Sequence, residues 1–268
     1  MRIHRGWTRA AAALLTALTL TAPALGAGVT LDGEAVPEDQ AWVAEGVSCM
    51  TLRAYADRTS CTLTWEEGTA RLTGKDLILE ARPGSPYITA NGWPIYVAGG
   101  VQTVEGRTCL PLRVLAQATG ASLSWNEETQ TAALVQGEAR ALPAAGDREE
   151  DLYWLSRIIS AESRGEPMLG LIAVGNVVLN RVASEQFPNT IREVVFDVQN
   201  GVQFEPVSNG TVYDEPAQSA IQAARLCLEG ARPVEDCLYF FAPALSAGTW
   251  IVNNCTYHTT IGSHQFYS

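Results

Sequence analysis

The sequence has little positive charge. It carries 18 Lys and Arg residues against 29 Asp and Glu, for a formal net charge of −11 at pH 7. Because nucleic acids and anionic membranes bind basic surfaces, this balance argues against both as partners. An uncharged or zwitterionic substrate suits it better. The 268 residues are enough for two domains, each with its own core.

Long apolar runs are also scarce. The run from Ala10 to Leu20 is too short to span a bilayer, and Arg2, Arg5 and Arg9 precede it. Small residues follow this run. The basic start, the apolar run and the small residues together predict a secretory signal peptide over residues 1–27, cleaved near residues 26–27. No cysteine adjoins that position, so a lipid anchor is not expected. The sequence predicts a secreted protein without integral membrane contact after cleavage.

Six cysteines in a chain predicted to be exported raise the question of disulfide bridges. The six are Cys49, Cys61, Cys109, Cys227, Cys237 and Cys255. Three in each half leave at least one thiol unpaired per half, unless a bridge crosses between the halves. Cys227 falls in a helical run, where we expect a small buried hydrophobe. A Cys237–Cys255 bridge and six reduced thiols are the two alternatives.

The first half of the chain contains an internal repeat at an offset of 60 residues. Residues 49–56 (CMTLRAYA) match residues 109–116 (CLPLRVLA), and residues 60–65 (SCTLTW) match residues 120–125 (GASLSW). Each copy predicts a helical turn carrying Leu-Arg, a small-residue stop and an alternating strand that ends in Trp. We expect Trp65 and Trp125 to be core residues, and the alternative is that either ring stacks on a carbohydrate.

This repeat resembles the copper amine oxidase N-terminal-like domain, a small α+β module of exported cell-surface proteins. The resemblance covers residues 28–136 and implies an adhesion or spacer domain. It implies neither copper nor oxidase activity, because the catalytic part of that family is absent. Residues 137–150, with Gly, Pro and a charged stretch, predict a linker to a second domain at 151–268.

The second domain is predicted to be mainly helical with a β-ribbon. Helices are expected up to Glu162, at Met168–Ala183 and at Glu215–Gly230, with a short turn at Ile191–Phe196. Residues 201–211 favour a hairpin or looped ribbon. The tail favours strands at 237–241, 249–252 and 256–267.

One acid lies on an apolar helix face. Glu162 follows Ile158 and Ile159 at helical spacing, one turn before a Gly-Glu-Pro stop. Burial there would raise the pKa of its carboxyl and keep it protonated, as a general acid requires. The alternative is a structural Glu at the helix end that pairs with Arg157 or Arg164.

Motifs around and after this acid resemble the spore cortex-lytic cell wall hydrolase family. They are residues 161–167 (AESRGEP), 173–182 (AVGNVVLNRV), 187–191 (FPNTI), 203–210 (QFEPVSNG) and 261–264 (IGSH), in that order. The resemblance implies a lysozyme-like fold, peptidoglycan cleavage and Glu162 as general acid. Ser163 departs from the usual Ala, and family members often carry a peptidoglycan-binding repeat where this chain has its first domain. The expected fold class is α+β: a small β-rich repeat domain followed by a mainly helical, lysozyme-like domain with a β-ribbon.

No second carboxylate is an obvious nucleophile among Glu166, Asp197, Glu205 and Asp214. Glu166, beside Pro167, is expected to cap or brace a turn. A lone acid suits a lytic transglycosylase, in which the muramic 6-hydroxyl attacks and one Glu acts as acid and then base. The sequence therefore favours cleavage of the β-1,4 bond between N-acetylmuramic acid and N-acetylglucosamine with a 1,6-anhydro product, and hydrolysis stays open.

Flat rings and amides are the expected sugar contacts of such an enzyme. The candidates are Gln203, Phe204, Asn209, Tyr239, Phe241 and Trp250. Cys237, Cys255, His258 and His264 match no standard zinc spacing, so neither a metal nor another cofactor is expected. The expected partners are peptidoglycan glycan strands of the cell wall or spore cortex. The rival interpretation is a catalytically silent wall-binding or adhesion protein.

Overall fold

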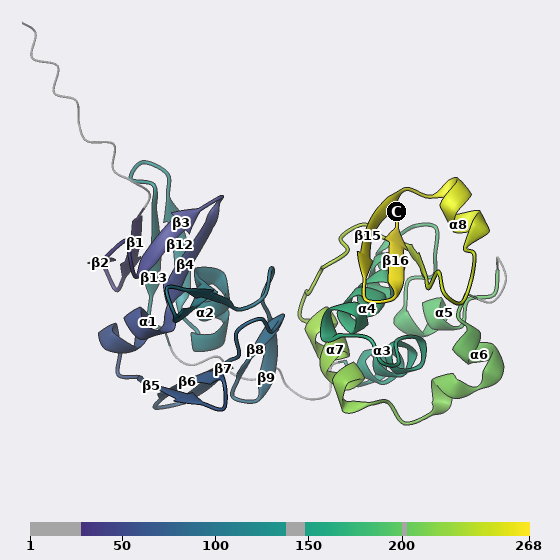
Figure 1. The fold of residues 1–268 in the computed structure, drawn as a ribbon, viewed down its shortest axis with the longest axis horizontal. Coiled ribbons are helices and arrows are strands. Elements are labelled where there is room, and N and C mark those ends of the chain that lie inside the picture. Colours follow the sequence, from purple (N-terminus) through teal and green to yellow (C-terminus); the bar gives the residue numbers. More distant parts are fainter. Residues whose placement is uncertain (1–27, 138–147, 200–202) are drawn as a thin grey trace, which may run out of the picture.

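A computed structural model describes residues 28–137, 148–199 and 203–268 of the chain (Figure 1). The predicted signal peptide and most of the predicted linker lie outside the described residues. Within the described residues, strands dominate before residue 137 and helices dominate after residue 148. This confirms the prediction of a mixed α+β protein. None of the described helices has the length and hydropathy that crossing a membrane requires.

The first part of the chain forms three sheets around one core. Their strand orders are β12-β13-β1-β2, β10-β11-β4-β3 and β5-β6-β7-β8-β9. The elements are β1 (Gly28–Leu31), β2 (Glu34–Val36), β3 (Ala41–Ala44), β4 (Val47–Thr51), α1 (Leu52–Arg58), β5 (Thr62–Glu66), β6 (Thr69–Gly74), β7 (Leu77–Ala81), β8 (Tyr87–Ala90), β9 (Trp93–Tyr96), β10 (Gln102–Val104), β11 (Arg107–Pro111), α2 (Leu112–Thr119), β12 (Ser122–Asn126) and β13 (Thr131–Val135).

The matching stretches of the repeat adopt the same order of elements. β4, α1 and β5 correspond to β11, α2 and β12, and the two equivalent strands pair antiparallel with Met50 opposite Leu110. Both of these side chains are fully buried. The two copies therefore share one core, with β4 and β11 at its centre.

The prediction that both repeat tryptophans are core residues is wrong. Trp65 is 61% exposed and Trp125 is 44% exposed. The predicted sheet face is right. Leu63, two residues before Trp65 on the same face, pairs with the buried Leu72. Trp65 lies near the strand end, where that face extends beyond the core.

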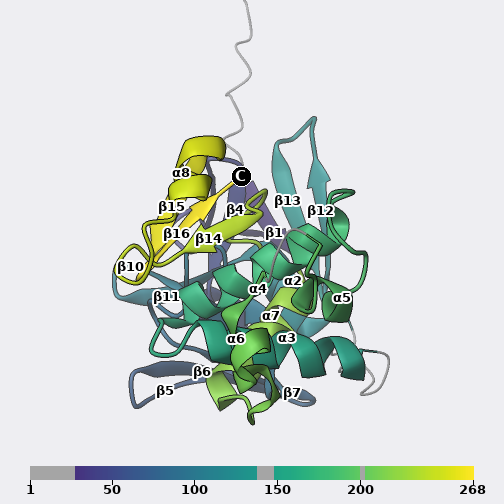
Figure 2. The ribbon, with the colours of Figure 1, turned by 90° about the vertical axis from the view of Figure 1, so that its right-hand side faces the viewer.

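The second part of the chain is a group of helices with a small sheet. The elements are α3 (Glu149–Glu162), α4 (Met168–Ala183), α5 (Ile191–Val195), α6 (Glu205–Asn209), a 3₁₀ turn (Thr211–Tyr213), α7 (Gln218–Leu228), β14 (Tyr239–Phe241), α8 (Thr249–Asn254), β15 (Tyr257–Ile261) and β16 (His264–Tyr267). The sheet order is β14-β16-β15, and this sheet lies over α4 (Figure 2). The predicted bounds of α4 are confirmed.

Two stretches that were predicted to be extended are helical. Within the stretch 201–211, Glu205–Asn209 form helix α6 instead of part of a hairpin. Glu205 and Pro206 suit a first helical turn, and Gly210, with φ 84°, ends the helix. Residues 249–252 belong to α8, which follows Gly248 at φ 54°. These short helices are set by their end residues rather than by an apolar period.

The two parts of the chain are in contact through β8, β9 and α7 (Figure 1). The hydroxyl of Tyr87 donates to the side-chain oxygen of Gln222 at 3.4 Å. The guanidinium of Arg225 lies 5.3 Å from the ring centre of Trp93. These contacts fix one face of α7 against the first domain.

The helix that ends in Glu162, α3, packs closely against α4 and α7. A Cβ on Gly175 of α4 would lie 2.6 Å from Cδ1 of Ile159 and 2.8 Å from Sγ of Cys227. Cys227 is 2% exposed, which confirms its expected role as a small buried hydrophobe. All six cysteines are unpaired, so the Cys237–Cys255 bridge is not formed. Only glycine allows α3, α4 and α7 to approach this closely.

We expect Gly175→Val to destabilise the second domain. The added side chain overlaps Ile159 and Cys227, and overpacking of this kind costs about 1–3 kcal/mol. Urea unfolding monitored by circular dichroism measures the change. Ala183→Val, at the exposed end of the same helix, is the matched control and should change stability little. Equal stability of the two variants would contradict this account of the packing.

Candidate active site

Glu162 is the last residue of α3 and lies where the apolar face of that helix ends. Ile158 and Ile159 on the preceding turn are fully buried, and the next residue, Ser163, is 1% exposed. The Glu162 side chain itself is half-buried. The structure thus places a carboxyl group at the edge of a hydrophobic core, as the helical spacing predicts.

Burial raises the pKa of Glu162 from 4.5 to about 7. The negative charge of Glu205 adds to this effect, and the positive charge of Arg181 opposes it. A large fraction of Glu162 is therefore protonated near neutral pH. A carboxylic acid in this state can donate a proton and, once ionised, can take one back.

The alternative that Glu162 is a salt-bridged structural residue does not hold. Arg157 pairs with Glu215 at 3.3 Å, and Arg164 pairs with Asp214 at 3.6 Å. Glu162 has no hydrogen bond or ion pair with any residue of the described ranges. Both nearby arginines therefore have other partners, and the acid is not held by either.

Arg181 of α4 is the charged neighbour that sequence reasoning missed. Its side chain is 4% exposed, and its Nε donates to the carbonyl of Leu238 at 2.8 Å. The guanidinium faces three rings, with its carbon 4.9 Å from Phe187, 5.1 Å from Phe204 and 5.6 Å from Tyr239. Cation–π contacts of this kind stabilise a buried cation.

The electrostatics of Arg181 link it to Glu162. Burial lowers the pKa of Arg181 to about 10, and the charges of Tyr239, Asp197 and Glu162 oppose that shift. Its Nη1 has no hydrogen-bond partner in the described residues. A detectable signal existed, because Arg181 follows the buried Val174, Val177 and Val178 at helical spacing. A charged residue at helical spacing from apolar ones is the same pattern that singled out Glu162.

Four other carboxylates were candidates for a second catalytic group, and the structure separates them. Glu205, exposed in the first turn of α6, is the one whose charge acts on Glu162. Asp214 is paired with Arg164, and Asp197 accepts a hydrogen bond from the amide of Gln199 at 2.9 Å. Among these, Glu205 is the best placed to influence the acid.

Glu166, the fourth, braces the turn between β15 and β16. Its carboxylate accepts hydrogen bonds from the amide of Ser263, at 3.1 Å, and from the Ser263 hydroxyl. Nδ1 of His264 lies 3.7 Å away, and a Cβ on Gly262 would overlap the same carboxylate. Burial lowers the pKa of His264, and Glu166 opposes this shift. The expectation of a bracing role agrees with these contacts, although the braced turn is distant in sequence.

Three of the predicted sugar-binding aromatics gather on one side of β14. Tyr239 contacts Trp250 edge-on at 5.5 Å, and Phe241 stacks on Tyr267 at 5.7 Å. Phe240 points the other way and packs against Phe266 in the core. Trp250 is 59% exposed, on helix α8. These rings therefore offer an accessible aromatic surface.

The other predicted contacts differ from one another. Phe204 is 2% exposed and packs beneath Arg181, so the prediction that its ring contacts a sugar is wrong. Asn209 is exposed, and its side-chain oxygen accepts from the amide and hydroxyl of Thr211. Gln203 is half-buried and lies two residues before α6. In the described ranges, no three His, Cys, Asp or Glu residues are arranged to hold a metal ion.

Two surface hollows lie near this group of residues. One, of about 670 Å³, has Phe187 and Asp197 in its lining, and both are neighbours of Arg181. The other, of about 330 Å³, is lined by Ser163 and Glu166 among others. Glu162 lines neither, so the chemistry of the acid identifies the site better than the shape of the surface does.

Two families match the chain. Residues 165–267 match the family described as Cell Wall Hydrolase, and residues 23–134 match the Copper amine oxidase N-terminal domain. Both resemblances inferred from the sequence are confirmed. The first match begins at Gly165, after Glu162, so it assigns no role to that residue.

Individual relatives cover the second part of the chain. A spore cortex-lytic enzyme of Bacillus cereus is 37% identical over 106 residues, which are 40% of this chain and 40% of that protein. The cell wall hydrolase CwlJ of Oceanobacillus iheyensis is 37% identical over 101 residues, 35% of this chain and 70% of that protein. The solved catalytic domain of the germination-specific lytic transglycosylase SleB from Bacillus anthracis is 34% identical, and the TM-score is 0.43. The match covers 47% of this chain and 100% of that domain. The chain thus spans well under half the length of the spore cortex-lytic enzyme.

We expect Glu162→Gln to stabilise the protein at high pH and not at low pH. The folded state keeps the Glu162 proton up to about pH 7, whereas the unfolded state loses it near pH 4.5. As the pH rises between these values, ionisation favours the unfolded state, and the wild-type protein loses up to about 3 kcal/mol.

Urea unfolding at pH 4 and at pH 8 measures this difference. Glu150→Gln, at an exposed position of the same helix, is the control and should show no comparable gain at pH 8. A Glu162→Gln variant with the same relative stability at both pH values would contradict the raised pKa.

Proposed function

Because the chain belongs to the cell wall hydrolase family, we propose that it cleaves peptidoglycan glycan strands with Glu162 as general acid. The observation that carries the proposal is the half-buried carboxyl of Glu162, with a pKa raised to about 7 and no paired cation. Protonation of a leaving oxygen requires an acid of this kind near neutral pH.

The bond we assign to this acid is the β-1,4 bond between N-acetylmuramic acid and N-acetylglucosamine. Glu162 donates its proton to the glycosidic oxygen as the bond from C1 to that oxygen breaks. The 6-hydroxyl of the muramic residue then attacks C1 and gives its proton to the Glu162 carboxylate. The acid is regenerated, a 1,6-anhydro product forms and no water is consumed. This is the reaction of a lytic transglycosylase.

Arg181 fits this cycle because it acts on the ionised form of Glu162. Its positive charge lowers the pKa of the acid, whereas burial and Glu205 raise it. The balance keeps both protonation states accessible near pH 7. One residue can then serve as acid in the first half of the reaction and as base in the second.

Hydrolysis is the second candidate mechanism, and Glu205 is the observation that favours it. Glu205 is an exposed carboxylate whose charge acts on Glu162. An inverting hydrolase uses such a second carboxylate to activate water. The two mechanisms differ in whether Glu205 takes part in catalysis.

The proposed substrate contacts are Tyr239, Phe241 and Trp250, with the amides of Gln203 and Asn209. Accessible rings suit the apolar faces of sugars, and amides suit N-acetyl groups and hydroxyls. The ring of Phe204 is excluded because it is buried. The aromatic surface beside β14 is therefore the expected path of the strand.

The domain assignment follows from the same proposal. We assign residues 151–268 to a lysozyme-like catalytic domain, 137–150 to a linker and 28–136 to an adhesion or spacer domain. With a signal peptide at 1–27, the protein would act outside the cell, in the wall or in spore cortex during germination. The name of the spore cortex-lytic relative supports the cortex as substrate. A catalytically silent wall-binding protein is the alternative.

We expect Glu162→Gln to lower the rate of peptidoglycan cleavage by about 10²–10⁴-fold, because the amide cannot donate the required proton. Release of soluble fragments from purified cortex and vegetative peptidoglycan measures the rate. Glu235→Gln, at an exposed position, is the matched control. Unchanged activity of Glu162→Gln would sink the proposal.

Mass spectrometry of the products and the Glu205→Gln variant separate the two mechanisms. Transglycosylation leaves 1,6-anhydro ends and needs no second carboxylate, so Glu205→Gln should retain most of the activity. Reducing ends, with loss of activity in Glu205→Gln, would favour hydrolysis instead.

A further inference from the structure

Two exposed tryptophans occupy equivalent positions in the two copies of the repeat. Trp65 ends the alternating run of β5, and Trp125 ends that of β12. Each is preceded in its copy by an exposed arginine of a short helix, Arg53 in α1 and Arg113 in α2. Buried positions shared by two copies are explained by packing. Shared exposed Trp and Arg residues are not, and they point to a role at the surface.

The local fold makes each Trp an accessible surface. Trp65 pairs across the sheet with Ala70, and Trp125 pairs with Ala132. Both alanines are 2% exposed, so each ring lies next to a small, buried neighbour. A large flat ring beside such a residue offers an open apolar platform.

Trp65 also lines a hollow of about 370 Å³ between two sheets. The lining residues are Arg53, Leu63, Thr64, Trp65, Ala70, Gly106, Arg107 and Thr108. They come from α1, β5, β6, β11 and the turn between β10 and β11. The lining of the hollow therefore combines apolar residues with two arginines.

The charges around this hollow favour an anionic ligand. Arg53 has no hydrogen bond or ion pair within the described ranges. Arg107 is already engaged, because its Nη1 lies 3.5 Å from the carboxylate of Asp39 and donates to the Asp39 carbonyl. Arg53 is thus the available cation, in a chain whose overall charge is negative.

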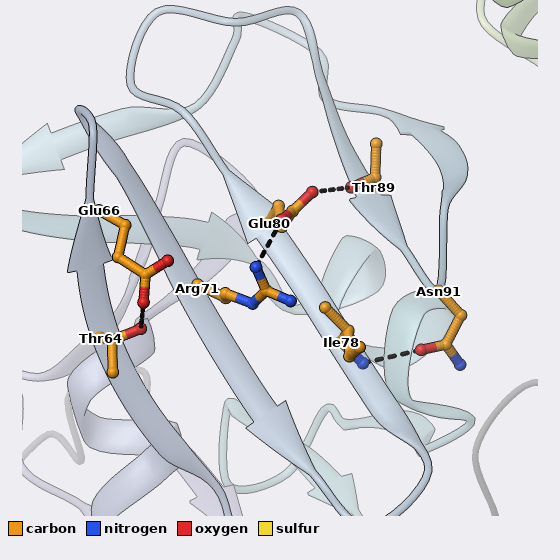
Figure 3. Close-up of polar contacts among 7 residues, drawn as sticks. All are labelled: Thr64, Glu66, Arg71, Ile78, Glu80, Thr89 and Asn91. Carbon is orange, nitrogen blue, oxygen red and sulfur yellow. Dashed lines mark hydrogen bonds and ion pairs between the residues drawn. The ribbon is translucent and has the colours of Figure 1, made fainter.

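The opposite face of the same sheet differs. There Arg71 pairs with Glu80, which accepts from Thr89, and Thr64 donates to Glu66 (Figure 3). These polar groups pair with one another, Arg71, Glu80 and Thr89 across neighbouring strands and Thr64 with Glu66 along β5. The hollow beside Trp65 has instead an exposed ring from β5 and, from α1, the cation of Arg53, which has no partner in the described ranges.

We propose that the hollow at Trp65 binds an anionic glycan strand, one sugar ring stacking on Trp65 and a carboxylate pairing with Arg53. The identification of that strand as peptidoglycan, whose peptide stems carry carboxylates, rests on the proposed function. The site lies in the first domain and is separate from Glu162. It would hold the enzyme on its polymer while the second domain cleaves.

The second copy is an incomplete version of this site. Trp125 and Arg113 are equivalent to Trp65 and Arg53, but Val47 stands at the position equivalent to Arg107. Val47 is 48% exposed and offers no polar group from its side chain. The hollow at Trp65 is therefore the stronger of the two sites.

Co-sedimentation of the full chain with purified insoluble peptidoglycan tests the proposal. All proteins carry Glu162→Gln so that the polymer is not digested. Trp65→Ala is expected to weaken binding about tenfold, and Arg53→Gln to weaken it by less and to reduce its dependence on salt. Ile78→Ala, an exposed apolar position on the same sheet, is the matched control and should bind as the parent does. Thermal unfolding verifies that each variant is folded.

Binding by Trp65→Ala equal to that of the parent would overturn the proposal, and so would an equal loss in Ile78→Ala. The outcome is independent of the catalytic assignment. If the chain with Glu162 intact cleaves nothing, the proposed function fails while the Trp65 effect on binding can still be observed. If cleavage depends on Glu162 but Trp65→Ala binds peptidoglycan as well as the parent does, only the proposed binding site at Trp65 is wrong.

Discussion

The protonation state of the half-buried Glu162 carboxyl is the constraint on which the proposed chemistry of the second domain depends. Burial at the end of α3 and the charge of Glu205 favour the neutral acid, whereas Arg181 favours the carboxylate. With these opposing effects the pKa of Glu162 lies near 7, between the values that either would give alone. A group that must first donate and then accept a proton needs this balance.

Helix α4 connects the acid to the aromatic surface. Gly175 allows α4 to pack closely on α3, and Asn180 donates to the carbonyls of Val234 and Cys237 at 3.1 and 2.9 Å. Arg181 donates to the carbonyl of Leu238, directly before β14. One helix therefore sets the packing behind Glu162, supplies its charged neighbour and fixes the strand that carries Tyr239.

The sequence predicted the features that depend on helical periodicity. It did not predict those that depend on where a helix or strand begins or ends. The position of Glu162, the bounds of α4 and the burial of Cys227 follow from apolar spacing. Helix α6 (Glu205–Asn209) was not predicted, because Pro206 and Gly210 specify a helix too short to show an apolar period. Trp65 was assigned to the correct sheet face, but alternation cannot tell where along a strand the core ends. Arg181 was detectable by the argument used for Glu162.

A titration of the Glu162 carboxyl carbon by NMR tests the account most directly. The chain is labelled with ¹³C at glutamate side-chain carboxyls, and the Glu162 resonance is assigned by its absence from Glu162→Gln. The account predicts a midpoint near pH 7 for this signal. A midpoint near pH 4.5 would mean that the carboxyl is an ordinary ionised surface group at neutral pH, and the assignment of Glu162 as general acid would be contradicted.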